Sequence, residues 1–219
     1  MGNTVGSLEV PIMLRARKNL CLSLEERQRD ILIGCTIGDA YISPKGNIRI
    51  EQSIKQIDYV LWKYEELKSL AYPALPKQIN RFNSKRNKLY CSVYFELRRY
   101  FRSWRSIFYQ DGKKIFPKNL MLSPLSLAVW YMDDGCWTGS KVVISTEGFG
   151  DESEKRIQQT LHSQWNIETV IGKNRKLVIR KNSHDQFYGL IYPYITSSMH
   201  YKIPNPVTTS RLRRLSKVS

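Results

Sequence analysis

The sequence predicts an α+β fold built from two copies of one unit, in which helices cover one face of antiparallel sheets. Two apolar helical stretches, residues 32–40 and 127–135, each reach an aspartate near their end, Asp39 in the first and Asp134 in the second. Each stretch is followed by segments that alternate apolar and polar residues, as strands do when one face lies in the core and the other in water. Because this order occurs twice, a duplication explains it best. Two copies favour a closed pseudo-twofold pair over a solenoid.

Composition and charge narrow the class of protein. The chain has 219 residues, with 35 Lys and Arg against 19 Asp and Glu, which gives a net charge of +16. A hydrophobic content of 42% and an aromatic content of 11% are typical of a globular protein. The positive charge indicates a polyanionic partner, most simply nucleic acid, although a basic ribosomal or organellar protein is an alternative on charge alone. No apolar run approaches the ~20 residues of a membrane span, so no membrane partner is expected.

The first unit is predicted to start with the helix that carries Asp39. Ser23-Leu-Glu-Glu26 fits a capping box, so this helix is expected to run from about Leu24 to Asp39. The later elements are expected as strands at residues 48–54 and 89–97, with a helix between them at 57–70. The apolar face of that helix is expected to consist of Ile57, Leu61, Tyr64 and Leu67.

The second unit repeats this order. Ser123 is predicted to cap its first helix, with Pro124 at the first helical position, and Gly135 suits the end of that helix. The later elements are expected as strands at residues 141–146 and 176–181, with a helix between them at 152–165 after an Asp151-x-x-Glu154 start signal. The apolar face of that helix is expected to contain Ile157, Leu161 and Trp165.

The two aspartates are the first candidates for chemistry. A desolvated carboxylate must find a cation or take up a proton, and a helix C-terminus attracts a cation. If the two helices pack side by side, Asp39 and Asp134 emerge together. Oxygen ligands without clustered His or Cys favour a hard ion such as Mg²⁺, and Mn²⁺ is expected to substitute. A divalent ion held beside DNA suits hydrolytic phosphodiester cleavage.

The neighbours of the two acids are part of the predicted metal site. Asp133 precedes Asp134, but its counterpart in the first helix is Gly38. We therefore interpret Asp133 as helix-terminal and Asp134 as the metal ligand. For either acid taken alone, the alternative is an ordinary solvated residue at a helix end. The predicted metal site comprises Asp39 and Asp134 together with the adjoining residues Ala40 and Asp133.

Two lysines recur at matched positions late in each unit. Lys114 stands in Lys-Ile-Phe-Pro and Lys202 in Lys-Ile-Pro. We predict that both act in catalysis, by holding a water network or by offsetting charge at the phosphate. An ordinary surface lysine is the alternative.

The polar faces of the strands are rich in basic residues. Arg and Lys bind phosphates and read guanine in the major groove, which admits a two-stranded ribbon, although charged strand faces are often only solvated. The predicted DNA-binding residues are Arg49, Glu51, Gln52, Lys55, Arg81, Lys85, Arg86, Lys88, Arg98, Lys141, Ser145, Lys173, Arg175, Lys176, Arg180 and Lys181. The polar residues that follow the acids are expected to line a water pocket, with ordinary polar groups at a sheet edge as an equal alternative: Glu51, Gln52, Ser145, Thr146 and Glu147.

Three segments resemble the LAGLIDADG homing endonucleases. They are Ile37-Gly-Asp-Ala-Tyr-Ile42, Leu127-Ala-Val-Trp-Tyr-Met-Asp-Asp-Gly135 and Tyr201-Lys-Ile-Pro-Asn205. The resemblance covers residues 24 to 206 and is closest to the single-chain, two-motif branch encoded within group I introns of organelles. It implies two αββαββα half-domains, packed through the motif helices, with saddle-shaped antiparallel sheets that grip a long asymmetric DNA site.

The resemblance also implies an activity. Asp39 and Asp134 map to the metal-binding acids of the motif, and Lys114 and Lys202 map to basic residues near the active site. A Mg²⁺-dependent endonuclease is expected, in which each half cuts one strand across the minor groove to leave 3′ overhangs. Two alternatives remain: a maturase that assists splicing of its host group I intron by binding the intron RNA, and a non-catalytic DNA-binding protein.

The resemblance suggests an organisation for the whole chain. The expected domains are a basic N-terminal extension at 1–22, half-domains at 23–118 and 119–206, and a basic C-terminal tail at 207–219. A monomer is expected, acting on an intronless copy of the host gene in a chloroplast or mitochondrion.

The sequence departs from the motif in ways that predict an asymmetric helix interface. Ala40 replaces the closing glycine of the first motif. Gly34 and Gly38 allow close packing on the first helix, whereas Val129 and Asp133 occupy those places on the second.

Overall fold

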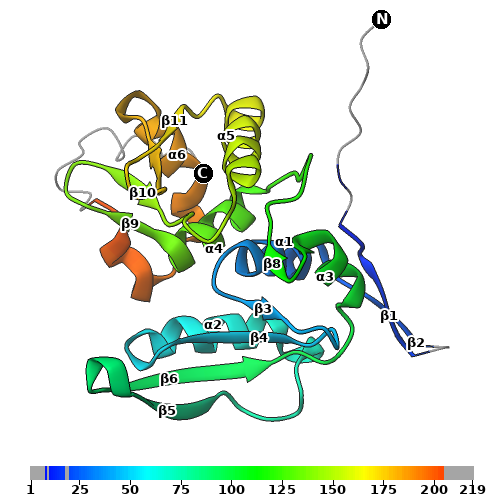
Figure 1. The fold of residues 1–219 in the computed structure, drawn as a ribbon. Coiled ribbons are helices and arrows are strands. Elements are labelled where there is room, and N and C mark those ends of the chain that lie inside the picture. The colour runs from blue at the N-terminus through cyan, green and yellow to red at the C-terminus, as the bar shows by residue number, and fades with distance from the viewer. Residues whose placement is uncertain (1–7, 9, 18–19, 205–219) are drawn as a thin grey trace, which may run out of the picture.

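The computed structural model describes residues 8, 10–17 and 20–204. A β-hairpin of β1 (Met13–Arg17) and β2 (Leu20–Ser23) comes first and is followed by two units of the same design (Figure 1). The C-terminal tail predicted at 207–219 and Asn205 of the third motif segment lie outside the described residues. No helix in the described part of the chain is both long enough and apolar enough to cross a membrane.

The two units have matching elements in the same order. The first contains α1 (Glu26–Ile37), β3 (Tyr41–Ile42), β4 (Ile48–Ser53), α2 (Ile57–Leu67), β5 (Lys77–Asn83), β6 (Lys88–Glu96) and α3 (Arg102–Phe108). The second contains α4 (Pro124–Asp134), β9 (Gly135–Trp137), β10 (Val142–Ile144), α5 (Asp151–Trp165), β11 (Thr169–Ile171), β12 (Leu177–Ile179) and α6 (His184–Ile191). A small hairpin of β7 (Tyr109–Gln110) and β8 (Lys113–Lys114) precedes the second unit, and a 3₁₀ segment, η6 (Ser197–Lys202), follows it.

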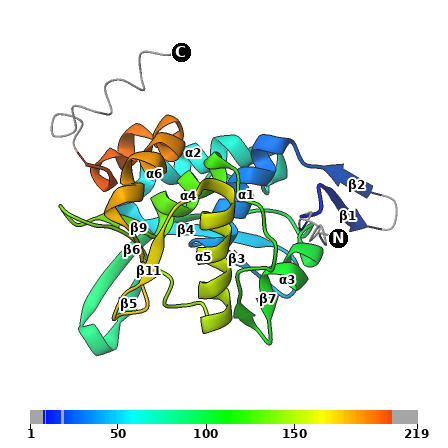
Figure 2. The same ribbon diagram turned by 90° about the horizontal axis from the view of Figure 1, so that it is seen from above.

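The sheets confirm the predicted α+β fold and its duplication. The first sheet has the order β3-β4-β6-β5 and the second has the equivalent order β9-β10-β12-β11, with antiparallel pairing throughout. Figure 1 shows α1 and α4 in the middle of the molecule, between the two sheets, and Figure 2 shows the two helices side by side. The two motif helices therefore join the halves.

The ends of the motif helices agree with the sequence prediction in one case and differ in the other. Ser123 caps α4 through its hydroxyl, which accepts from the Ser126 amide, and Gly135 is the C-cap. The predicted capping box of α1 is wrong, because Ser23 is the last residue of β2. The helix begins at Glu26 without a side-chain cap.

The predicted apolar face of α2 is half right, because Leu67 is buried and Tyr64 packs against the core. Ile57 and Leu61 are exposed, and the residues that α2 buries are Tyr59, Val60, Lys63 and Leu67. The buried face of α2 is rotated relative to the predicted face, because Lys63 points to a buried carboxylate on α4 instead of to solvent. In α5, Ile157 and Leu161 are buried as expected, but Gly150 is the N-cap, so Asp151 lies in the first turn.

The interface between α1 and α4 is asymmetric, as predicted. A methyl group added at Gly34 would lie 2.6 Å from the Ser126 carbonyl oxygen and 2.7 Å from Cβ of Val129. A methyl group added at Gly38 would lie 2.6 Å from an Asp133 carboxylate oxygen. The glycines of α1 thus receive the larger residues of α4.

Candidate active site

The end of each motif helix carries one acid. Asp39 follows the C-cap of α1, Gly38, and is exposed, whereas Asp134 is the last residue of α4 and is half-buried. Burial raises the pKa of Asp134 to about 7, and the negative charges of Asp39 and Asp133 add to this effect. The two predicted acids therefore lie close enough for the charge of Asp39 to raise the pKa of Asp134.

This acid pair, Asp39 and Asp134, fits a divalent cation. Among the described residues, neither carboxylate forms an ion pair with a Lys, Arg or His side chain. Their mutual repulsion and the partial negative charge of two helix C-termini favour a bound cation, and carboxylate oxygens are ligands that Mg²⁺ prefers. No cluster of three or more His, Cys, Asp or Glu side chains suited to a metal occurs in the described ranges, so further ligands would have to be backbone, water or phosphate oxygens.

The two matched lysines lie against the helix ends. Nζ of Lys114 donates to the carbonyls of Gly38 and Ala40, the latter at 2.9 Å. Nζ of Lys202 donates to the carbonyls of Met132 and Asp133, the latter at 2.9 Å. Each lysine thus holds the carbonyl that immediately precedes its own acid. Burial lowers the pKa of both ammonium groups, which the nearby aspartates oppose.

Asp133, which was included in the predicted metal site, directs its carboxylate into the protein. Its side chain is fully buried and forms an ion pair with Nζ of Lys63 at 2.6 Å. The Tyr59 hydroxyl donates to the same oxygen at 3.0 Å. Burial lowers the pKa of Lys63, but the adjoining carboxylate outweighs burial and keeps this pKa raised. The other predicted neighbour, Ala40, is buried and offers Lys114 its carbonyl.

Sequence reasoning missed Lys63 and Tyr59. A signal was present, since Val60, Lys63 and Leu67 recur at the spacing of one helix face, which places a lysine in an apolar stripe. Lysine is seldom fully buried without a partner, so such a stripe points to an acid opposite it.

Gln52, which was predicted to bind DNA, contacts Asp39, one acid of the pair. It is buried on the same face of β4 as Ile50. Its amide donates to Oδ2 of Asp39 at 2.7 Å and to Oδ1 of Asp133 at 3.3 Å. The sequence signal is a polar residue in the apolar phase of a strand.

The solvent face of the first sheet carries a network around Glu51. Its carboxylate accepts from Arg49 at 2.8 Å, from Ser92 and from Arg81. Burial opposes ionisation of Glu51, but the hydrogen bonds from Arg81, Ser92 and Arg49 outweigh it and lower the pKa to about 2. The other predicted basic residues of this half are exposed just before α2 and around the β5–β6 turn, namely Lys55, Lys85, Arg86 and Lys88. Arg98 donates to the carbonyl of Ala71.

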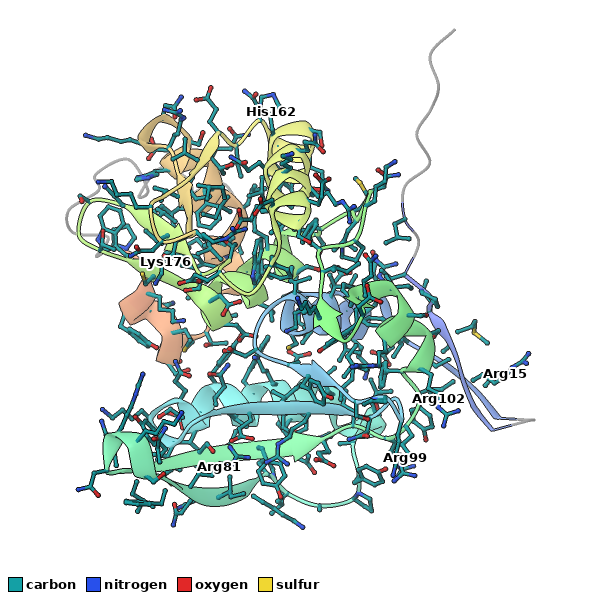
Figure 3. All side chains as sticks on the ribbon, in the orientation of Figure 1. Arg15, Arg81, Arg99, Arg102, His162 and Lys176 are labelled. Atoms are coloured by element: carbon teal, nitrogen blue, oxygen red, sulfur yellow. The ribbon has the colours of Figure 1, made fainter. Side chains whose placement is uncertain are left out.

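The second sheet gathers most of its predicted basic residues in one hollow. This hollow is lined by Lys141, Lys173, Arg180 and Lys181. Arg175 instead pairs with Asp151 and Glu154 of α5, and Lys176 pairs with Glu147. The amide of Ser145 donates to the Asp134 carbonyl. Figure 3 shows Arg81 on the first half and Lys176 on the second.

Comparison with known proteins shows which family this chain belongs to. A sequence model of the LAGLIDADG DNA endonuclease family matches residues 29–187. The chain belongs to this family. The match covers both acids and both sheets, so it confirms the resemblance seen in the motif segments.

Relatives of this LAGLIDADG protein carry several names. This chain is 28% identical to the probable intron-encoded endonuclease 1 of Wickerhamomyces canadensis, over 87% of this chain and 90% of that protein. It is 26% identical to the cytochrome b mRNA maturase bI2 of Saccharomyces cerevisiae, over 94% of this chain and 50% of that protein. It is 27% identical to the RecA protein of Mycolicibacterium flavescens, over 82% of this chain and 47% of that protein. The chain thus spans about half the length of the last two relatives.

One solved structure shares the fold. The homing endonuclease I-WcaI bound to its DNA recognition sequence superposes with a TM-score of 0.74 at 24% identity, covering 84% of this chain and 88% of that one.

Proposed function

We propose that this protein is a site-specific endonuclease that hydrolyses both strands of a long asymmetric DNA duplex in a Mg²⁺-dependent reaction. The observation that carries the proposal is the acid pair, two carboxylates without ion-pair partners in the described residues, at the adjoining ends of α1 and α4. Family membership supports this reading. A relative is named an intron-encoded endonuclease, and the solved neighbour I-WcaI is bound to its DNA recognition sequence.

Asp39 and Asp134 would hold the divalent ion. A Mg²⁺ ion at this place supplies charge neutralisation at the scissile phosphate and acidifies a water molecule, and Mn²⁺ suits the same oxygen ligands. The protein's part is to fix the two carboxylates on rigid helix ends, so that little reorganisation is needed when charge develops on the phosphate.

Lys114 and Lys202 would serve both structure and chemistry. Two of the three N–H donors of each ammonium group go to carbonyls beside the acids, which holds the acid-bearing turns in place. The third donor of each can hold a water molecule or a phosphate oxygen. Their lowered pKa makes proton transfer to a leaving oxygen easier than from an ordinary lysine.

The two sheets would bind the duplex on either side of the acid pair. Exposed lysines and arginines on the sheets and hairpins would neutralise phosphates, so affinity should fall steeply with salt. A protein with two unlike halves suits an asymmetric site, and we propose that it acts as a monomer with one half serving each strand, cutting across the minor groove to leave 3′ overhangs. The natural target would be an intronless copy of the host gene in an organelle, a proposal supported by relatives named for introns and for cytochrome b mRNA.

A cleavage assay tests the proposal. The full chain is incubated with a plasmid that carries the joined exons flanking its reading frame, with Mg²⁺ or with EDTA. We expect a single double-strand break near the exon junction with Mg²⁺ and none with EDTA. Intact plasmid in Mg²⁺, despite tight binding to the joined exons, would contradict the endonuclease proposal.

A maturase is the second candidate, because two relatives, from Saccharomyces cerevisiae and Debaryomyces hansenii, are named cytochrome b mRNA maturases. This reading predicts tight binding to the host intron RNA and faster splicing of it. Asp39→Asn and Asp134→Asn should leave splicing unchanged, since the acids hold metal for DNA cleavage. Failure to bind the intron RNA would exclude the maturase reading.

A further inference from the structure

A buried ion pair crosses from one half of the molecule to the other. Lys63 belongs to α2 of the first half and Asp133 to α4 of the second, and both side chains have an exposed fraction of 0%. Taking two charges out of water is costly, and an apolar pair of similar volume often gives equal stability. The need to hold the halves together does not by itself explain these charges.

The ion pair leads to one of the two acids. Oδ1 of Asp133 accepts from Lys63, and Oδ2 accepts from the backbone N–H of Asp39 at 3.3 Å. The amide of Gln52 bridges Asp133 and Asp39, donating to the Asp39 carboxylate at 2.7 Å. Asp39 is therefore held through both its backbone and its carboxylate.

The second half has no equivalent of this network at the matched positions. Gly38 takes the place of Asp133, and, counted from the helix starts, Ile157 of α5 takes the place of Lys63. The position that matches Gln52 is Thr146, which lies just past the end of β10 and whose hydroxyl donates to the carbonyl of Arg175. In the part of the chain that the structure describes, this network therefore contacts Asp39 and not the carboxylate of Asp134.

We propose that Lys63 and Asp133 are positioning residues that fix Asp39 through Gln52 and thereby make the protein cut the two DNA strands at unequal rates. This inference rests on the proposed endonuclease function. Holding the Asp39 carboxylate more firmly than that of Asp134 makes one phosphate better placed than the other for attack, because small displacements of reacting groups change rates strongly. The protein should then nick one strand of its target before the other.

The test measures each strand separately. A duplex with a different fluorophore on each strand is cut by the wild type and by the double variant Lys63→Met/Asp133→Leu, which replaces the buried charges with apolar side chains. We expect the ratio of the two initial nicking rates to move towards unity by about 10-fold, a typical effect of residues that orient metal ligands. DNA affinity should stay within about twofold and the variant should remain folded.

A matched control uses another ion pair between helices of the first half. Arg27 of α1 pairs with Glu66 of α2 at the surface, and neither contacts the acid pair. Arg27→Met/Glu66→Gln should leave the strand ratio unchanged. A similar shift in this control would mean that the ratio reports general loosening of α2, which would overturn the proposal.

A second variant decides the matter if the double variant fails to fold. Gln52→Met removes the bridge to Asp39 and leaves the ion pair intact, so it should shift the strand ratio in the same direction. Equal slowing of both strands, or an unchanged ratio, in a folded variant that binds DNA would overturn the proposal. If the wild type cuts neither strand in Mg²⁺, the endonuclease function itself has failed, which is a distinguishable result.

Discussion

In the first half of the molecule, Asp39 lies exposed just past the end of α1 and is held by Gln52, whereas in the second half Asp134 is half-buried at the end of α4. Asp134 also has a pKa raised to about 7. Duplication preserved the fold and the place of the acids but changed their surroundings. The two helix ends therefore share one task and need not contribute equally to it.

The sheets differ in the same way. In the first half, β5 and β6 have 7 and 9 residues and form a long hairpin with Phe82 and Leu89 exposed. In the second half, β11 and β12 have 3 residues each. A long ribbon on one side and a short one on the other present different surfaces to a duplex, which suits an asymmetric target.

The largest expected effect comes from removing either acid. Asp39→Asn and Asp134→Asn should each lower the rate of DNA cleavage by at least about 100-fold, because each removes charge that a divalent ion needs at the phosphate. DNA affinity should change little. Glu152→Gln, at an exposed position on α5, is the control and should cut like the wild type. Loss of cleavage and DNA affinity together would instead indicate that the acids hold the fold.

A second prediction concerns the helix interface. Gly34→Ala should lower the free energy of unfolding by about 1–3 kcal/mol, because the added methyl group meets Ser126 and Val129 at distances that demand a shift of α4. Gly148→Ala, with nothing near the added methyl group, should change stability by less than about 0.5 kcal/mol. Equal unfolding midpoints in a denaturant titration would show that α1 and α4 do not pack this closely.

A third prediction uses the raised pKa of Asp134. Because the pKa of Asp134 is raised from 3.8 to about 7 in the folded state, its protonation stabilises the fold at low pH, and this contribution disappears as pH rises through 7. In metal-free protein, the melting temperature of Asp134→Asn minus that of the wild type should therefore grow as pH rises from about 5.5 to about 8.5. Mg²⁺ should reduce this pH dependence. A constant difference across the range would contradict the raised pKa.

The smallest expected effect tests the first sheet. Glu51→Gln should release Arg49 and Arg81 from their shared carboxylate, so the slope of log affinity against log salt should steepen by about 1 as more phosphate contacts become available. Affinity for unrelated DNA should rise a few-fold. Glu65→Gln, which breaks the exposed pair with Lys68 on α2, should leave the slope unaltered. A slope that stays the same in Glu51→Gln would mean that these arginines do not reach phosphates.

Much of the architecture could be predicted from the sequence, because it depends on local periodicity. The duplicated order of helices and strands follows from alternation, and Ser123, Pro124 and Gly135 fix the ends of α4 through local backbone chemistry. The asymmetric helix interface was also predictable, since the two glycines of α1 have larger counterparts on α4.

The contacts that depend on tertiary packing could not be predicted in this way. Lysine on a helix normally faces solvent. Lys63 is buried because its ammonium group pairs with the buried Asp133 opposite it. The same packing turns Ile57 and Leu61 outward. Ser23 matches a capping box, but pairing with β1 draws it into a strand. In each case a long-range partner outweighs the local preference.

Anomalous diffraction from crystals of the full chain with Mn²⁺ and its DNA target tests most directly whether the two helix ends form one metal site. The account predicts an anomalous peak within about 2.2 Å of a carboxylate oxygen of Asp39 and another within that distance of Asp134, or one peak shared by both. Peaks located only elsewhere in the complex, with both carboxylates free of metal, would contradict it.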